Sequence, residues 1–158
     1  MQLAQSMGIP ILELAARDSV ALSEDVTLTV YNPVPGVETD HVNDRSLLAL
    51  VAHNQHGVLF TGDLETTGEP AVIPEAEVLK VAHHGADNAT SARFLAACDP
   101  ELAIISVGEN SFDHPGDGAL ARLRDSGADI LTTRERGAIT LTLHDDAWRV
   151  HTYLEASQ

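Results

Sequence analysis

Short apolar runs separated by polar turns recur along the chain, and their period and length predict a mixed α/β fold. The runs are rich in valine, isoleucine and leucine and are too short for most helices, which favours β-strands. We therefore expect strands at residues 9–14, 26–31, 46–52, 58–61, 77–82, 102–107, 129–132, 138–144 and 148–153.

Two of these runs, residues 46–52 and 58–61, are almost continuously apolar. Strands of that kind are usually covered on both faces, so we expect both to be buried on two sides. Residues 53–57 should form the turn between them. The polar residues 17–19 predict another turn, and residues 32–44 form the longest predicted loop.

Two short helices are predicted between the later strands. Residues 91–98 form the first, with Thr90 as its N-cap and Pro100 preventing its continuation. Residues 118–126 form the second, which Asp117 caps and Gly127 ends. Strands thus alternate with helices before a closing hairpin, and nothing in residues 1–158 divides the chain into more than a single domain.

The charge balance excludes non-specific binding to nucleic acids. The chain has 9 basic and 24 acidic residues, a net charge of -15, and its only lysine is Lys80. So negative a surface repels phosphate backbones, so we expect no non-specific nucleic-acid binding. Any phosphate contact must be local or assisted by a metal.

A single cysteine and the absence of long apolar segments exclude disulfide-linked, Cys-rich zinc and membrane-spanning classes for this segment. Cys98 alone forms neither an internal disulfide nor a Cys-rich zinc module, and it should be a buried structural thiol. A membrane-spanning helix needs about 18 or more apolar residues in a row, and the chain has no such run. We expect a soluble segment without membrane contact of its own, although a longer parent could carry membrane spans upstream.

Polar side chains follow three of the predicted strands. They lie at residues 62–65, 83–85 and 110–115. Loops at one edge of an α/β sheet are where sites are built, so these three predict a common site. Asp63, placed by Gly62 at the end of a strand, suits a carboxylate that bridges two cations, or simply a turn residue.

The adjacent His83 and His84 should point to opposite faces if they continue a strand. One would then contact a metal and the other would form a nearby hydrogen bond, unless both are merely exposed. His53 and His56 have the spacing of a ligand pair, but their predicted turn favours solvated side chains. We expect surface or packing roles for His41, His144 and His151.

Five motifs in order resemble a known family, the ComEC-type DNA-internalisation competence proteins. They are Asn43-Asp-Arg-Ser46, Thr61-Gly-Asp63, His83-His84-Gly85, Asn110 with His114-Pro115, and the closing Thr132-Thr-Arg. The resemblance covers about residues 9–143 and matches the C-terminal half of that family's metallo-β-lactamase domain. It implies the C-terminal part of an αββα sandwich.

By this resemblance the activity is metal-dependent hydrolysis of a phosphodiester, with single-stranded DNA taken up by a cell as the substrate. Zinc or manganese is the implied cofactor. Asp63 matches the bridging aspartate, and His84, or alternatively His83, matches the last histidine ligand. His114 would bind phosphate or protonate the leaving group. The implied supporting residues are Asn43, Ser46, Gly85 and Asn110.

Departures from the family pattern leave alternatives open. The family's first metal motif, H-x-H-x-D-H, does not occur in this sequence, Ala86 replaces a serine, and Asn32 replaces a histidine. The enzyme hypothesis therefore requires an N-terminal half-domain or a partner, in a parent attached to the bacterial inner membrane. The alternative is an inactive truncated domain that self-associates, for example as a homodimer. An acidic protein-binding module is a third interpretation.

Overall fold

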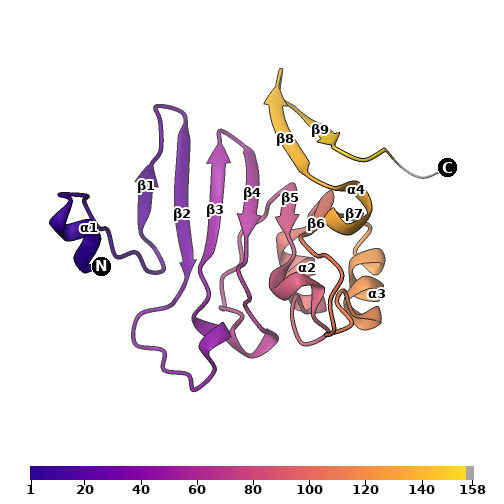
Figure 1. Ribbon diagram of the computed structural model, residues 1–158, viewed down its shortest axis with the longest axis horizontal. Coiled ribbons are helices and arrows are strands. Elements are labelled where there is room, and N and C mark those ends of the chain that lie inside the picture. The colour runs from indigo at the N-terminus through magenta and orange to yellow at the C-terminus, as the bar shows by residue number, and fades with distance from the viewer. Residues whose placement is uncertain (156–158) are drawn as a thin grey trace.

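The computed structural model describes residues 1–155, and its main feature is a seven-stranded sheet (Figure 1). The strands lie side by side in sequence order. Neighbours from β1 to β4 are antiparallel, and those from β4 to β7 are parallel. The seven are β1 (Ser19–Ala21), β2 (Val26–Asn32), β3 (Leu48–His53), β4 (His56–Phe60), β5 (Val78–Lys80), β6 (Leu102–Ile105) and β7 (Asp129–Thr132).

A separate antiparallel hairpin and several short helices complete the chain. The hairpin consists of β8 (Ile139–His144) and β9 (Ala147–Thr152). The α-helices are α1 (Gln2–Ser6), α2 (Ala92–Cys98), α3 (Asp117–Asp125) and α4 (Thr133–Arg136). Single 3-10 turns occur at Val42–Arg45, Thr66–Gly68 and Ala82–Gly85. In the described part of the chain, no helix is long and apolar enough to cross a membrane.

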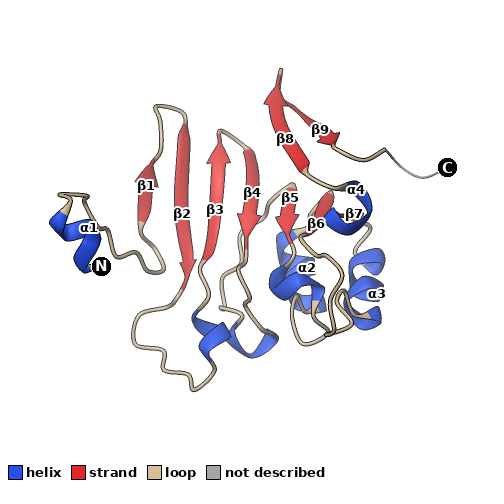
Figure 2. Cartoon of the chain, viewed as in Figure 1, coloured by secondary structure: helices blue, strands red, loops and turns tan. Residues whose placement is uncertain are grey.

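The hydrophobic core lies on one face of the sheet. Leu59 of β4 and Leu79 of β5 are fully buried on that face, in the same cluster as Phe94 of α2 and Leu123 of α3. Figure 2 shows these helices gathered beside β5–β7, with β1–β4 extending away from them. The mixed α/β fold class predicted from the apolar pattern is confirmed.

The opposite face is only partly covered, so the prediction that both middle strands are buried on two sides is wrong. Phe60, which alternates with Leu59 along β4, is 45% exposed. The partly exposed residues Val51 and Val58 share its face and border a cavity beneath the hairpin. The helices pack on one face of the sheet alone. Within residues 1–155, the β8–β9 hairpin covers just one end of the opposite face.

Several local predictions differ from the structure for identifiable reasons. Residues 9–14 form no strand, since Pro10 removes a backbone donor and the flanking apolar side chains are exposed. A short strand, β1, begins at Ser19, where a turn was predicted. Residues 53, 56 and 57 belong to strands, which leaves a two-residue turn.

Both predicted helix caps are displaced by one residue. Ser91, and not Thr90, caps α2, because its hydroxyl accepts the backbone N–H of Phe94 at 3.1 Å. Gly116 occupies the cap position of α3, and Asp117 is its first helical residue. The carboxylate of Asp87, from another loop, accepts the N–H of Ala119 at 2.8 Å and so does the work of a local cap.

Candidate functional site

The three loops that carry the predicted site residues meet at one edge of the sheet. They follow β4, β5 and β6, which are parallel, so their carboxyl ends lie at the same edge. His84 Nε2 lies 4.0 Å from Asp63 Oδ1. The ring centre of His83 lies 6.5 Å from that of His84 and 5.7 Å from that of His114. The structure thus brings Asp63, both adjacent histidines and His114 together.

The histidine pair does not continue a strand, so the prediction that strand alternation separates the two rings is wrong. β5 ends at Lys80, and His83 and His84 adopt left-handed backbone angles, with φ of 47° and 55°. Such angles cost a non-glycine residue roughly 1–2 kcal/mol each. The turn is held in place partly by the N–H of His83, which donates to the carbonyl of Gly62 at 3.1 Å. Backbone strain of this kind concentrates at functional sites.

His84 has the orientation of a metal ligand. Its Nδ1 lies 2.6 Å from the carbonyl oxygen of Ser106, which can only accept, so Nδ1 carries the hydrogen. Nε2 is then left with a free lone pair that faces the carboxylate of Asp63. Both side chains are about half exposed. Metal-ligating histidines are commonly fixed in this way by a carbonyl behind the ring. The geometry favours His84 over His83 as the ligand, which stays a prediction.

His83 belongs instead to a short polar chain with Glu65 and Asn43. Its Nδ1 is buried, forms no hydrogen bond and lies 3.6 Å from Glu65 Oε1. The amide of Asn43 donates to that same oxygen at 2.8 Å. Asn43, predicted as a supporting residue, therefore acts on the site through Glu65. Glu65 was not predicted to contact a histidine.

Ser46 and Gly62 fix the backbone that carries Asp63. The Ser46 hydroxyl accepts the N–H of Asp63 at 3.2 Å. Gly62 has a φ of +55°, and a Cβ at this position would lie 3.0 Å from the Cβ of Ser46. Both the positive φ and the close contact with Ser46 favour a glycine at this position. The carboxylate of Asp63 leaves the strand end from a defined point.

Lys80 is a component of this edge that sequence reasoning missed. Its ammonium group donates to the carbonyl of Gly62 at 3.3 Å. Burial lowers the pKa of Lys80, and the nearby charge of Asp63 partly offsets that effect. The signal was available, since the chain's only lysine stands three residues before the histidine pair. Lys80 places a positive charge beside the candidate metal ligands of this strongly acidic protein.

Gly85 allows the histidine turn to pack closely against the loop after β6. A Cβ on Gly85, which has a φ of +80°, would lie 2.7 Å from the Cβ of Pro115. The carbonyl of Gly85 also accepts the N–H of Gly116 at 2.9 Å. Gly85, implied by the resemblance as a supporting residue, therefore lets the histidine turn lie close to the loop that carries His114.

Asn110 organises the loop after β6. Its Oδ1 accepts the backbone N–H groups of Phe112 and His114, at 3.0 and 3.1 Å. Its Nδ2 donates to the carbonyl oxygens of Gly108 and His114, at 3.0 and 2.8 Å. One side chain thus closes the loop around His114. A cavity of about 540 Å³ lies beside it, lined by His84, Asn110, Phe112 and His114 together with Val107 and Thr133.

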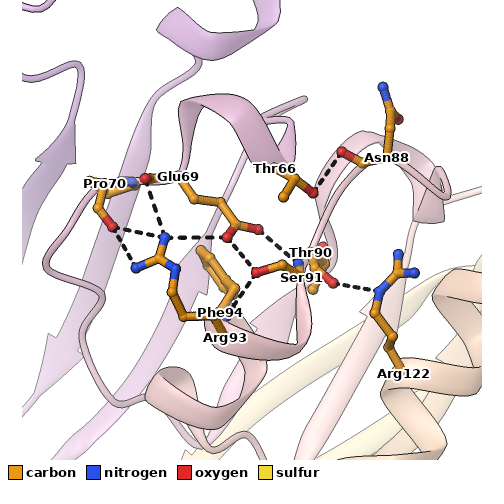
Figure 3. Close-up of polar contacts among 9 residues, drawn as sticks. All are labelled: Thr66, Glu69, Pro70, Asn88, Thr90, Ser91, Arg93, Phe94 and Arg122. Carbon is orange, nitrogen blue, oxygen red and sulfur yellow. Dashed lines mark hydrogen bonds and ion pairs between the residues drawn. The ribbon is translucent and has the colours of Figure 1, made fainter.

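The loops after β4 and β5 are tied together behind the site. Thr66 donates to the carbonyl of Asn88 through both its backbone N–H and its hydroxyl (Figure 3). The buried carboxylate of Glu69 accepts the backbone N–H and the hydroxyl of Ser91 and pairs with Arg93 (Figure 3). These contacts fix the loop of Asp63 relative to the loop of the two histidines.

The donors at this edge fit part of a metal site. A catalytic zinc ion takes three protein ligands, and Asp63 with His84 would supply two of them. Across residues 1–155, no three His, Cys, Asp or Glu side chains lie close enough together to hold a metal ion.

Outside this edge, one sequence interpretation is wrong and the others are confirmed. His56 is not solvated but 95% buried, and its Nδ1 lies 3.0 Å from both carboxylate oxygens of Glu77. Cys98 is a buried thiol whose pKa is raised to about 12, mainly by desolvation. The histidines expected at the surface are exposed: His41, His144 and His151.

Comparisons with known proteins relate the chain to competence proteins. No protein-family model matches it. It is 31% identical over 145 residues to ComE operon protein 3 of Bacillus subtilis, a match that covers 88% of this chain and 18% of that protein. It is 33% identical over 108 residues to competence protein ComA of Neisseria gonorrhoeae, covering 64% and 16%. The chain spans less than a fifth of the length of these curated relatives.

A solved structure supports the fold. A protein from Parabacteroides distasonis, named as a metal-dependent hydrolase, superposes with a TM-score of 0.53 over 83% of this chain and 60% of its own. The sequence identity is 14%, so the likeness extends to the fold alone. This chain is thus a relative of one part of bacterial competence proteins, built on an α+β fold that also occurs in a protein named as a hydrolase.

Proposed function

We propose that this chain is the C-terminal part of a metallo-β-lactamase-like domain that hydrolyses phosphodiesters of single-stranded DNA, in a parent protein of the ComEC type. The relatedness to competence proteins supports the link with DNA uptake. The shared fold supports the architecture. In such a parent the domain is attached to a protein of the bacterial inner membrane.

The observation that carries the proposal is the pairing of Asp63 with His84. Their facing atoms are 4.0 Å apart, a little wider than the roughly 3.3 Å that separates two donors of a tetrahedral zinc ion with bonds of roughly 2 Å, so a small inward movement of the two half-exposed side chains would let both reach one ion. The carbonyl of Ser106 holds the tautomer of His84 that leaves Nε2 available. A divalent zinc or manganese ion held there would act as a Lewis acid and activate water. The remaining ligands come from an N-terminal half-domain or a partner subunit.

The other residues of the site orient these groups and the substrate. Ser46 holds the N–H of Asp63, and Glu65 with Asn43 faces His83. Asn110 holds the backbone of His114, whose ring then binds the phosphate or protonates the leaving oxygen. Because the net charge of -15 repels a phosphate backbone, substrate binding relies on these local contacts.

Metal retention by matched variants tests the proposal. The chain would be mixed with the corresponding N-terminal half-domain, incubated with zinc or manganese, desalted and analysed for metal content and for cleavage of single-stranded DNA. We expect the wild type to retain metal and cleave, and Asp63→Asn and His84→Gln to lose both. His83→Gln is the matched control and should retain the metal. Metal retention that is unchanged in Asp63→Asn would refute the assignment.

The partly covered sheet face favours a second candidate function, that of an inactive module that self-associates. Phe60 is 45% exposed on that face, and apolar surface of this kind marks an interface. A homodimer would cover it. Sedimentation of the metal-free chain distinguishes the two: a dimer that Phe60→Asp dissociates, with no metal bound in any combination, supports the inactive module.

A further inference from the structure

An exposed aromatic ring stands at the mouth of the candidate site. Phe112 is 76% exposed, lines the same cavity as His84 and His114, and lies nearly parallel to the ring of His114. The ring centres are 6.0 Å apart and the planes differ by 23°. The chain has three phenylalanines, and Phe94 is buried in the core. Phe112 is therefore an aromatic ring whose outer surface is left open to a ligand.

The loop presents this ring in a fixed position. The N–H groups of Phe112 and His114 both donate to Asn110 Oδ1. Arg134 donates to the carbonyl of His114 at 3.2 Å. Because these hydrogen bonds already order the loop, a ligand that stacks on Phe112 would lose little affinity to the entropy cost of ordering it.

We propose that Phe112 is a stacking platform for an unpaired nucleobase of the strand whose phosphodiester lies against His84 and His114. This inference rests on the function proposed above and names the feature of the substrate that is recognised. Stacking on an aromatic side chain contributes about 1–3 kcal/mol per base, and a base paired within a duplex is not free to stack in this way. In so acidic a protein, a neutral base contact also supplies affinity that the phosphate backbone cannot.

The test measures binding of the metal-free chain to two fluorescent oligonucleotides of equal length, one with thymine bases and one abasic. Both carry the same phosphates, so the difference between them reports base contact. We expect the wild type to prefer the thymine strand and Phe112→Ala to weaken that binding about fivefold to a hundredfold, as the stacking energy implies. Phe112→Trp should retain it.

Tyr153→Ala is the matched control, because Tyr153 is an aromatic residue that is 79% exposed and does not line this cavity. Equal binding of both strands by the wild type, no binding of either, or an unchanged Phe112→Ala would overturn the proposal. The hydrolase proposal is tested by a different variant. Asp63→Asn should lose metal retention and cleavage but should keep the preference for the thymine strand. If the chain prefers the thymine strand but no mixture with the N-terminal half-domain cleaves DNA, the stacking role of Phe112 is supported and the hydrolase proposal is refuted.

Discussion

Two pairs of histidines near the middle strands differ in what surrounds them. His53 and His56 face each other across the β3–β4 hairpin, and His56 is buried with its Nδ1 3.0 Å from the carboxylate of Glu77. His83 and His84 follow β5 at the other end of the sheet, where the half-exposed His84 lies 4.0 Å from Asp63. His83 in the second pair lies 3.6 Å from Glu65, but its Nδ1 is buried, so His56 and His84 are the two whose carboxylate contacts differ in both distance and exposure.

The difference separates a structural histidine from a candidate ligand. His56 touches its carboxylate directly, so no ion fits between them, and a second donor, Trp148, completes the contact. His84 is fixed from behind by a carbonyl and stands away from its carboxylate with solvent access. The contacts of His56 therefore join parts of the fold, whereas Nε2 of His84 stays accessible as a candidate metal ligand.

The largest effect on stability is expected from His56→Ala. The substitution leaves a cavity and removes the donor that Glu77 contacts, which should lower the free energy of unfolding by about 3 kcal/mol. Urea denaturation followed by circular dichroism measures it. His84→Ala is the control for the exposed pair and should cost less than about 1 kcal/mol. Similar losses in both variants would contradict the distinction between a structural His56 and an exposed candidate ligand His84.

The contrast also shows which features the sequence could predict. The alternation of short strands and helices followed from apolar period, and the common site followed from polar residues after parallel strands, because these positions depend on local pattern and sheet topology. The partners of His56 could not be found in this way. Glu77 lies 21 residues away and Trp148 still further, so their meeting depends on how the hairpin folds back.

Other features were missed because they depend on tertiary packing. The burial of β4 on one face alone could not be read from its apolar run, which suits a strand covered on both sides. The left-handed turn at His83 and His84 overrides the preference of non-glycine residues and is fixed by contacts from neighbouring loops. Lys80 had no partner visible in the sequence until the fold placed Gly62 beside it.

An intermediate effect is expected where the turn of the candidate ligand packs against the loop of His114. Gly85→Ala places a Cβ against Pro115 in a backbone conformation that L-residues avoid, which should cost about 2 kcal/mol. Thermal unfolding measures the loss. Gly108→Ala is the matched control, since a Cβ there meets no atom within 4 Å, and it should leave stability nearly unchanged. Equal effects at the two glycines would mean that this loop adapts freely.

The smallest effect, and the sharpest test of how Asp63 is held, is expected from Ser46→Ala. The hydroxyl of Ser46 accepts the N–H of Asp63, so its removal should cost about 1 kcal/mol, as for one ordinary hydrogen bond. Ser106→Ala is the control, because Ser106 contacts His84 through its backbone carbonyl, which the substitution keeps. If Ser46 positions the carboxylate, its variant should also weaken metal retention in the completed domain while Ser106→Ala does not. A loss of stability without any change in metal retention would limit Ser46 to a role in the fold, and the distance between Asp63 and His84 would then be set by Gly62 and Lys80.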